Sequence, residues 1–124
     1  MVFRRALLAL ATAALSLTLV AGAVADRPAT KNERKAIAKI LNMPPKCAKV
    51  RISTVTKRPK WATERFKPGP KVCDQVAHDG VGVFKKRKGR WRFVTAGSDF
   101  DCPRLYRKVP KRIAEDLGLD EWCH

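Results

Sequence analysis

The sequence predicts an α+β domain in which an N-terminal helix and a C-terminal helix accompany an antiparallel sheet of about four strands, held by two disulfides. Three observations predict this class. Apolar residues recur first at helical spacing, then at the two-residue spacing of strands, and at the end of the chain at helical spacing again. A glycine turn separates two strand-like runs. Four cysteines follow a segment with the features of an export signal.

The first 25 residues are predicted to be a cleaved secretory signal peptide. Two arginines precede a largely apolar run, and Ala23 and Ala25 supply the small residues that a signal peptidase accepts. An uncleaved membrane anchor is the alternative, since the run is barely long enough to span a bilayer. The alanine content and the processing site favour cleavage. Residues 26–124 then form one small domain that is secreted, either extracellular or associated with the cell wall.

Positive charge dominates the chain, with 27 Lys and Arg against 11 Asp and Glu and a formal net charge of +16. The predicted signal removes two arginines and no acidic residue, which leaves +14 on 99 residues. This excess predicts attraction to anionic polymers such as nucleic acid or a wall polymer, or to an anionic lipid surface. The alternative is a solvated surface whose lysines discourage strand aggregation and have only non-specific affinity.

The four cysteines, Cys47, Cys73, Cys102 and Cys123, all lie beyond the predicted signal. Their even number in an exported domain predicts two disulfides, for which three pairings are possible. We favour Cys47–Cys73 with Cys102–Cys123, because each bond then closes a local loop and contributes about 3 kcal/mol on the chain-entropy account. A zinc site is the alternative, but the spacing lacks a close cysteine pair. We expect no metal and no cofactor.

Local signals place the elements in order. Thr30 and Glu33 fit a capping box, and the apolar spacing that follows predicts a helix over residues 31–42. Alternation predicts strands from residue 49 and over residues 61–66, and a third strand begins somewhere between residues 72 and 81. Residues 26–29 are expected to be a short polar leader. Pro110 suits the start of the last helix and Gly118 its end.

The clearest local signal is a β-hairpin over residues 81–95 with Lys88-Gly89 as its two-residue turn. In this register Phe84 faces Phe93, and Lys86 faces Trp91. Because side chains alternate, the aromatic residues share one face of the hairpin, and a slip of one residue would mix them with the cations. The opposite face carries Lys85, Arg87, Arg90 and Arg92.

Cations directly opposite one another, Arg87 with Arg90 and Lys85 with Arg92, should destabilise the hairpin by a few tenths of a kcal/mol each. Something anionic is therefore expected to compensate, either an acid on a neighbouring strand, such as Glu64, or a polyanionic partner. Residues 57–60 form a second basic turn. The sequence predicts a non-enzymatic, monomeric binder of anionic polymers whose patch consists of Lys85, Lys86, Arg87, Lys88, Arg90 and Arg92.

Two other classes stay open. His78, the only internal histidine, could work with Glu64, Asp79, Asp99 or Asp101 as the acid–base set of a small secreted hydrolase such as a ribonuclease, although no spacing supports it. A loop over Cys102-Pro103-Arg104 could occupy a protease cleft as an inhibitor, or could simply connect two elements.

Aromatic residues at strand spacing offer two interpretations. Trp61 and Trp91 could stack nucleic-acid bases, as in single-strand binders. Their periodicity with Phe66, Phe84 and Phe93 favours a core, because a small domain has few other large residues.

The last third of the chain carries a set of motifs: Gly89-Arg90-Trp91-Arg92-Phe93, Gly97-Ser98, Cys102, Pro110, and Asp116-Leu117-Gly118-Leu119 before Cys123. In these motifs and in its layout, the chain resembles small exported actinobacterial proteins of uncharacterised function. The resemblance implies an α+β fold and a bond between Cys102 and Cys123. It brings no catalytic residues.

Overall fold

The computed structural model describes residues 26–124, so the predicted signal peptide lies outside the described residues. Its strands are β1 (Arg27–Pro28), β2 (Ala48–Ile52), β3 (Trp61–Phe66), β4 (Val81–Arg87) and β5 (Arg90–Gly97). Its α-helices are α1 (Lys31–Ile40), α2 (Cys102–Lys108) and α3 (Lys111–Asp116). Its short 3₁₀ helices are η1 (Pro45–Cys47), η2 (Lys71–Val76) and η3 (Leu119–Trp122).

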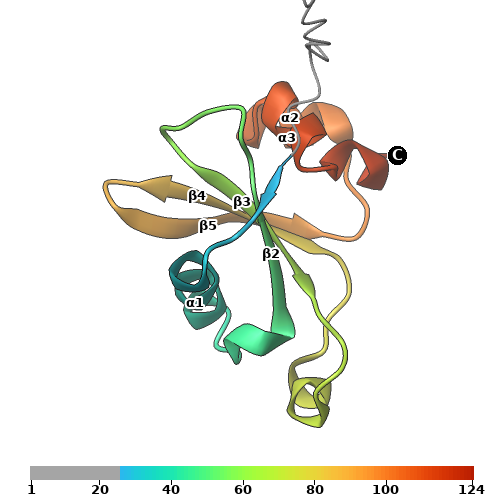
Figure 1. The fold of residues 1–124 in the computed structure, drawn as a ribbon. Helices are drawn as coiled ribbons and strands as arrows, with labels where there is room; N and C mark the ends of the chain where they lie inside the picture. Colours follow the sequence, from blue (N-terminus) through green and yellow to red (C-terminus); the bar gives the residue numbers. More distant parts are fainter. Residues whose placement is uncertain (1–25) are drawn as a thin grey trace, which may run out of the picture.

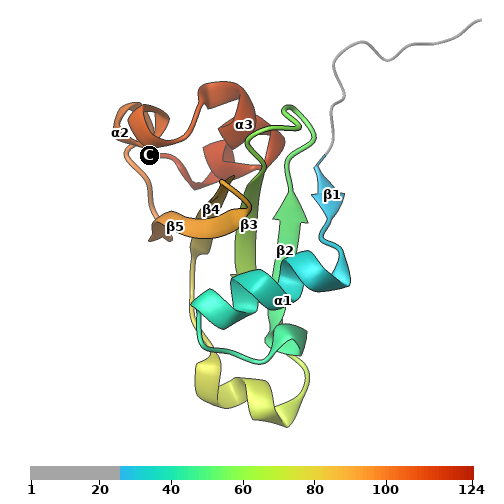
Figure 2. The same ribbon diagram turned by 90° about the vertical axis from the view of Figure 1, so that its left-hand side faces the viewer.

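The strands form one antiparallel sheet in the order β1-β2-β3-β4-β5, so each strand pairs with its neighbours in the sequence. Helix α1 packs on one face, and α2, α3 and η3 pack on the other (Figure 1 and Figure 2). The predicted α+β class is thereby confirmed. Beyond these helical layers the β4–β5 hairpin projects outward, and its tip is free of both (Figure 1).

The sheet divides the core into two apolar clusters because successive side chains of a strand point to opposite faces. Ile37 of α1 packs with Phe84 and the apolar residues of β2 on one face. Val83 and Trp61 pack with the C-terminal helices on the other. The central strands β3 and β4 contribute to both clusters.

The capping box predicted for the first helix is present. Thr30 Oγ1 accepts a hydrogen bond from the Glu33 N–H at 3.2 Å, and Glu33 Oε1 accepts one from the Thr30 N–H at 2.9 Å. The helix ends at Ile40, two residues before the predicted limit.

The sheet has five strands rather than about four. The segment predicted as a polar leader contributes β1, in which Arg27 pairs with Ile52 and Pro28 with Arg51. Residues 71–76, where a third strand could have begun, form η2 instead, and β4 starts only at Val81.

The segment proposed as an inhibitor loop is helical, so that premise is wrong. Cys102, Pro103 and Arg104 form the first turn of α2. Asp101 caps this turn, its Oδ1 accepting from the Arg104 N–H at 3.4 Å. Proline is favoured in a first helical turn, where its missing N–H removes no hydrogen bond. A rigid extended loop is therefore absent here.

Both predicted disulfides are confirmed. Cys47–Cys73 joins η1 to η2, and Cys102–Cys123 joins the start of α2 to the residue after η3. The Cα atoms of each pair are 5.3 Å apart, a separation typical of disulfides. All four cysteines are used, so none is free to ligate zinc as a thiolate.

Candidate anion-binding groove

The predicted register of the hairpin is confirmed. Arg87 pairs with Arg90, Lys85 with Arg92, and Phe84 with Phe93. The two turn residues, Lys88 and Gly89, have φ angles of 50° and 76°. Positive φ at both positions is what a two-residue turn of the I′ type requires. Along β5 the cations Arg90 and Arg92 therefore alternate with Trp91 and Phe93, whereas on β4 three consecutive cations, residues 85–87, follow Phe84.

Aromatic rings support two of these lysines. Lys85 Nζ lies 4.9 Å from the centre of the Trp61 ring, and Lys86 Nζ lies 6.0 Å from that of Trp91. A cation over an indole face is attracted by the ring quadrupole. Because the two lysines lie on opposite faces of β4, each face of the hairpin carries a half-buried lysine resting on a tryptophan.

The second basic turn joins the hairpin tip in a single groove. Since β3 pairs with β4, the residues before Trp61 lie beside the end of β4, and the Lys86 N–H donates to the Lys60 carbonyl at 2.8 Å. The groove between them has a volume of about 820 Å³. Its lining contains seven cations and no acidic residue: Lys57, Arg58, Lys60, Lys85, Lys86, Arg87 and Lys88, with Pro59 and Gly89.

The acidic side chains of the described chain lie outside the lining of this groove. Of the cations in this groove, only Lys60 has an ion-pair partner among residues 26–124, Glu33, whose Oε2 is 3.5 Å from Lys60 Nζ. Arg90 and Arg92 also lack a carboxylate partner within those residues. Six of the seven cations that line the groove thus have no carboxylate partner among the described residues.

Glu64 does not compensate the hairpin cations, which corrects that expectation. Its side chain is 1% exposed, on the α1 face of the sheet, and Oε1 lies 2.9 Å from His78 Nε2. Burial raises the pKa of Glu64, while the hydrogen bond and charge of His78 oppose that rise. Of the four acids considered for His78, the structure brings Glu64 into side-chain contact with it.

The geometry around His78 limits its use as an acid or base. Nε2 contacts Glu64, and Nδ1 lies 3.4 Å from the Asp79 carbonyl oxygen. The Phe66 ring lies 6.1 Å from the imidazole, centre to centre. In residues 26–124, the linings of five cavities with volumes of about 360 to 820 Å³ include neither Glu64 nor His78.

The aromatic residues divide between core and surface. Trp61 is 3% exposed and belongs to the core on the face of the C-terminal helices, as its periodicity predicts. Trp91 is half-buried against the α1-side cluster. Phe93 was expected in the core but is 53% exposed. It lies on β5, which is the outermost strand of the sheet that residues 26–124 form, and its ring meets Phe84 edge-on.

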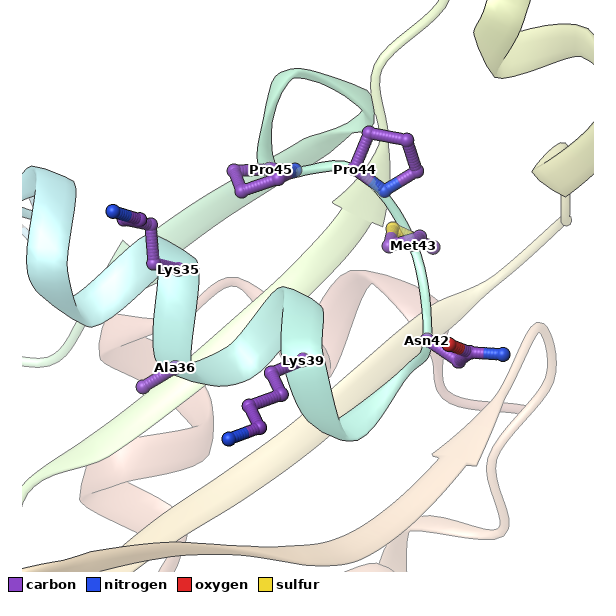
Figure 3. A pocket seen from close by; sticks show the side chains of 7 residues that line it. All are labelled: Lys35, Ala36, Lys39, Asn42, Met43, Pro44 and Pro45. Atoms are coloured by element: carbon purple, nitrogen blue, oxygen red, sulfur yellow. The ribbon is translucent and has the colours of Figure 1, made fainter.

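Three further cavities are less strongly basic or more distant from the hairpin. One lies beside the end of α1, with a volume of about 680 Å³ (Figure 3). Its charged residues are Lys35 and Lys39, and residues 42–45 form its other wall. Two others, of about 410 and 520 Å³, flank β2 and share Lys49, Arg51 and Arg65. In the smaller of these, four acids accompany the cations.

Sequence reasoning identified the six hairpin cations and the second basic turn, but it did not place the two together. Their proximity follows from the antiparallel pairing of β3 with β4, which places the start of β3 beside the end of β4. Residues 26–124 contain no cluster of side chains suited to hold a metal ion. No helix in this part of the chain is long and apolar enough to cross a bilayer.

Comparison of the chain with protein-family models, curated proteins and solved structures found no match.

Proposed function

We propose that this chain is a secreted, non-enzymatic, monomeric protein that binds anionic polymers through its basic hairpin. The observation that carries the proposal is the groove of about 820 Å³ between the hairpin tip and residues 57–60, lined by seven cations and no acid. Cations gathered in a concave site concentrate the positive potential and attract polyanions.

The cross-strand pairs support the same conclusion. Arg87 opposite Arg90 and Lys85 opposite Arg92 repel each other, and like charges directly opposite destabilise a sheet. No acid of the described chain offsets this repulsion. An anionic ligand would remove it, so part of the binding free energy comes from relief of repulsion already present in the free protein.

Export is part of the proposal. Its support is the signal-like composition of residues 1–25 together with two disulfides, which persist in oxidising compartments. The proposed location is extracellular or at the cell wall. The proposed resemblance to small exported actinobacterial proteins is supported by the motif residues and by the layout of the chain.

The test measures binding to single-stranded DNA over a range of salt concentrations. Arg87→Gln, Arg90→Gln and Arg92→Gln together remove three exposed hairpin charges. If each contacts a phosphate, the slope of log affinity against log salt should fall in magnitude by about 2, since each phosphate contact on a single strand contributes about 0.7. The matched control removes three exposed lysines at the other end of the sheet, Lys46→Gln, Lys67→Gln and Lys71→Gln. An equal loss of slope in both triple variants would contradict binding by the hairpin.

The hydrolase alternative rests on the contact between Glu64 and His78. A ribonuclease would degrade RNA with a bell-shaped pH dependence and would lose this activity in His78→Ala. We expect no degradation by the unaltered protein. RNA cleavage that His78→Ala abolishes would favour the hydrolase.

A further inference from the structure

A second basic cleft adjoins the groove on the other side of Lys85 and Arg87. It has a volume of about 360 Å³ and lies between the hairpin and the end of α2. Four cations line it, and no acidic residue does. The lining consists of Lys85, Arg87, Arg92 and Lys108 around Trp61, Phe93 and Val94.

Lys108 is the cation that this cleft adds to the hairpin. It is an exposed residue in the last turn of α2, whose neighbours Leu105 and Val109 are buried in the core. The Cys102–Cys123 bond holds the start of the same helix. A rigid helix therefore presents Lys108 toward a cleft whose other cations come from β4 and β5.

Lys85 and Arg87 line both the groove and the cleft, so the two cavities adjoin at these two side chains. We call their combined cationic lining the track. Lys85 stands at their junction, with its Nζ over the buried Trp61 ring. This contact limits the rotamers of Lys85 without neutralising its charge. The track begins at Lys57 and Arg58, crosses the face of the hairpin and ends at Lys108.

We propose that this track binds a linear phosphodiester chain, with successive phosphates in the groove, at Lys85 and Arg87, and beside Lys108. This inference rests on the proposed function and adds the class of polymer and the path it takes. A single small anion would occupy only one of the two cavities. A flat lipid surface could not follow cations that line concave walls, whereas a flexible single chain with regularly spaced charges can.

Lys108→Gln tests the path, with Arg107→Gln as its matched control. Both residues lie in the last turn of α2 and are exposed, and only Lys108 lines the cleft. The two substitutions thus change the net charge and the charge at the helix end equally. The ligands are oligothymidylates of about 4 and about 16 nucleotides, spanning the site sizes of single-strand binders.

With the longer oligothymidylate, Lys108→Gln should lower the magnitude of the salt slope by about 0.7, the effect of one lost phosphate contact on a single strand. Arg107→Gln should leave the slope unchanged. The bound oligonucleotide should also protect Lys108 of the unaltered protein from acylation by an amine reagent, while Lys71 at the far end of the sheet stays reactive.

Failure of the path is distinguishable from failure of the proposed function. If the hairpin triple variant loses slope but Lys108→Gln behaves as Arg107→Gln does, the ligand does not reach the cleft and the inference is overturned. If the hairpin variant also keeps its slope, the proposed function itself fails. Equal affinity for the shorter and longer oligothymidylates would likewise overturn a track that spans both cavities.

A phosphodiester chain can be a nucleic acid or a polymer without bases. A second ligand, poly(glycerol phosphate), distinguishes the two, because it has the phosphodiester backbone without bases. The track as described contacts phosphates alone, so this polymer should show the same loss of slope in Lys108→Gln. If the protein binds vesicles of phosphatidylglycerol but binds neither oligothymidylate nor poly(glycerol phosphate), the ligand is a lipid surface and the proposal is overturned.

Discussion

Glu33 joins three segments of the protein through its carboxylate. Arg27 of β1 donates to both oxygens, at 2.8 and 3.0 Å, the Thr30 N–H donates at 2.9 Å, and Lys60 lies 3.5 Å away. The hydrogen bond from Arg27 is the main cause that lowers the pKa of Glu33 to about 2, opposed by burial. One side chain thus caps α1 and fixes the segment before β3.

This pKa predicts a loss of stability in acid. Because folding lowers the pKa of Glu33 from 4.5 to about 2, its contribution is present above pH 4.5 and is lost as the pH falls through 2. Glu33→Gln should reduce the free energy of unfolding by about 2 to 3 kcal/mol at neutral pH and by much less near pH 2. Urea unfolding over that pH range measures the difference. A loss that does not change with pH would show that the carboxylate charge is not responsible.

Glu64 should give the opposite pH dependence. Burial raises its pKa above 4.5, so the folded protein keeps this proton at pH values where the unfolded chain has released it. Its contribution to stability is therefore greatest below pH 4.5 and is lost as the pH rises through the raised pKa. Glu64→Gln cannot ionise, so its stability relative to the unaltered protein should improve as the pH rises through this window, as measured by urea unfolding.

His78 supplies the control for Glu64. It opposes the rise in the pKa of Glu64, so His78→Gln should move the window to higher pH. If Glu64→Gln unfolds with the same pH dependence as the unaltered protein, the carboxyl does not titrate differently in the folded and unfolded states.

At the scale of elements, two glycines at the ends of β4 face different demands. Gly80 and Gly89 both have positive φ, 87° and 76°. A Cβ on Gly89 would have open space, but one on Gly80 would lie 2.7 Å from the carbonyl oxygen of Gly97 at the end of β5. The start of β4 therefore requires glycine for conformation and for close approach of the backbones.

We expect Gly89→Ala to cost about 1 kcal/mol, from its left-handed conformation alone. Gly80→Ala should cost about 3 kcal/mol, because overpacking adds to the same strain. Chemical denaturation measures the loss of unfolding free energy in each variant. Because the φ angles of the two glycines are similar, the difference between the two losses reports the contact of a Cβ at position 80 with Gly97. Equal losses would contradict the clash at Gly97.

The elements that the sequence predicted best are those with local causes. The capping residues Thr30 and Glu33 determine the start of α1, and Gly89 with the flanking aromatic alternation determines the hairpin register. The start of α2 also has a local signal, Asp101 before Cys102-Pro103, although the expectation from the sequence at these residues is a loop. An acidic cap followed by proline is typical of a helix start.

The sequence predicted one part of the candidate site, the hairpin cations, and not the residues that the fold brings to them. The hairpin cations belong to one local unit, whereas the residues before β3 and Lys108 reach it through the packing of the whole domain. Phe93 was misplaced because alternation gives the face of a strand but not what covers it. Covering depends on the packing of the whole domain, in which β5 is the outermost strand.

At the scale of the whole molecule, the disulfides hold two separate regions and leave the hairpin free. Their loops span 26 and 21 residues, so each should contribute a similar chain entropy. Replacing Cys47 and Cys73 by alanine, or Cys102 and Cys123, should lower the free energy of unfolding by about 3 kcal/mol. Urea unfolding of both variants tests this, with reductant added to the unaltered protein as a control.

Since the Cys47–Cys73 bond includes no residue of the hairpin or of α2, a variant that lacks this bond and still folds should keep the salt dependence of binding of the unaltered protein. Loss of the Cys47–Cys73 bond accompanied by a reduced salt slope would show that the hairpin depends on η1 and η2.

The central strands send alternate side chains into both apolar clusters, and neither half of the interior can lose its packing without disturbing the strands of the other. Cooperative melting of the entire domain is the consequence. Amide protons of β3 and β4 should therefore exchange with deuterium only through global opening, whereas those of α1, which contacts one cluster alone, should also exchange through local fraying.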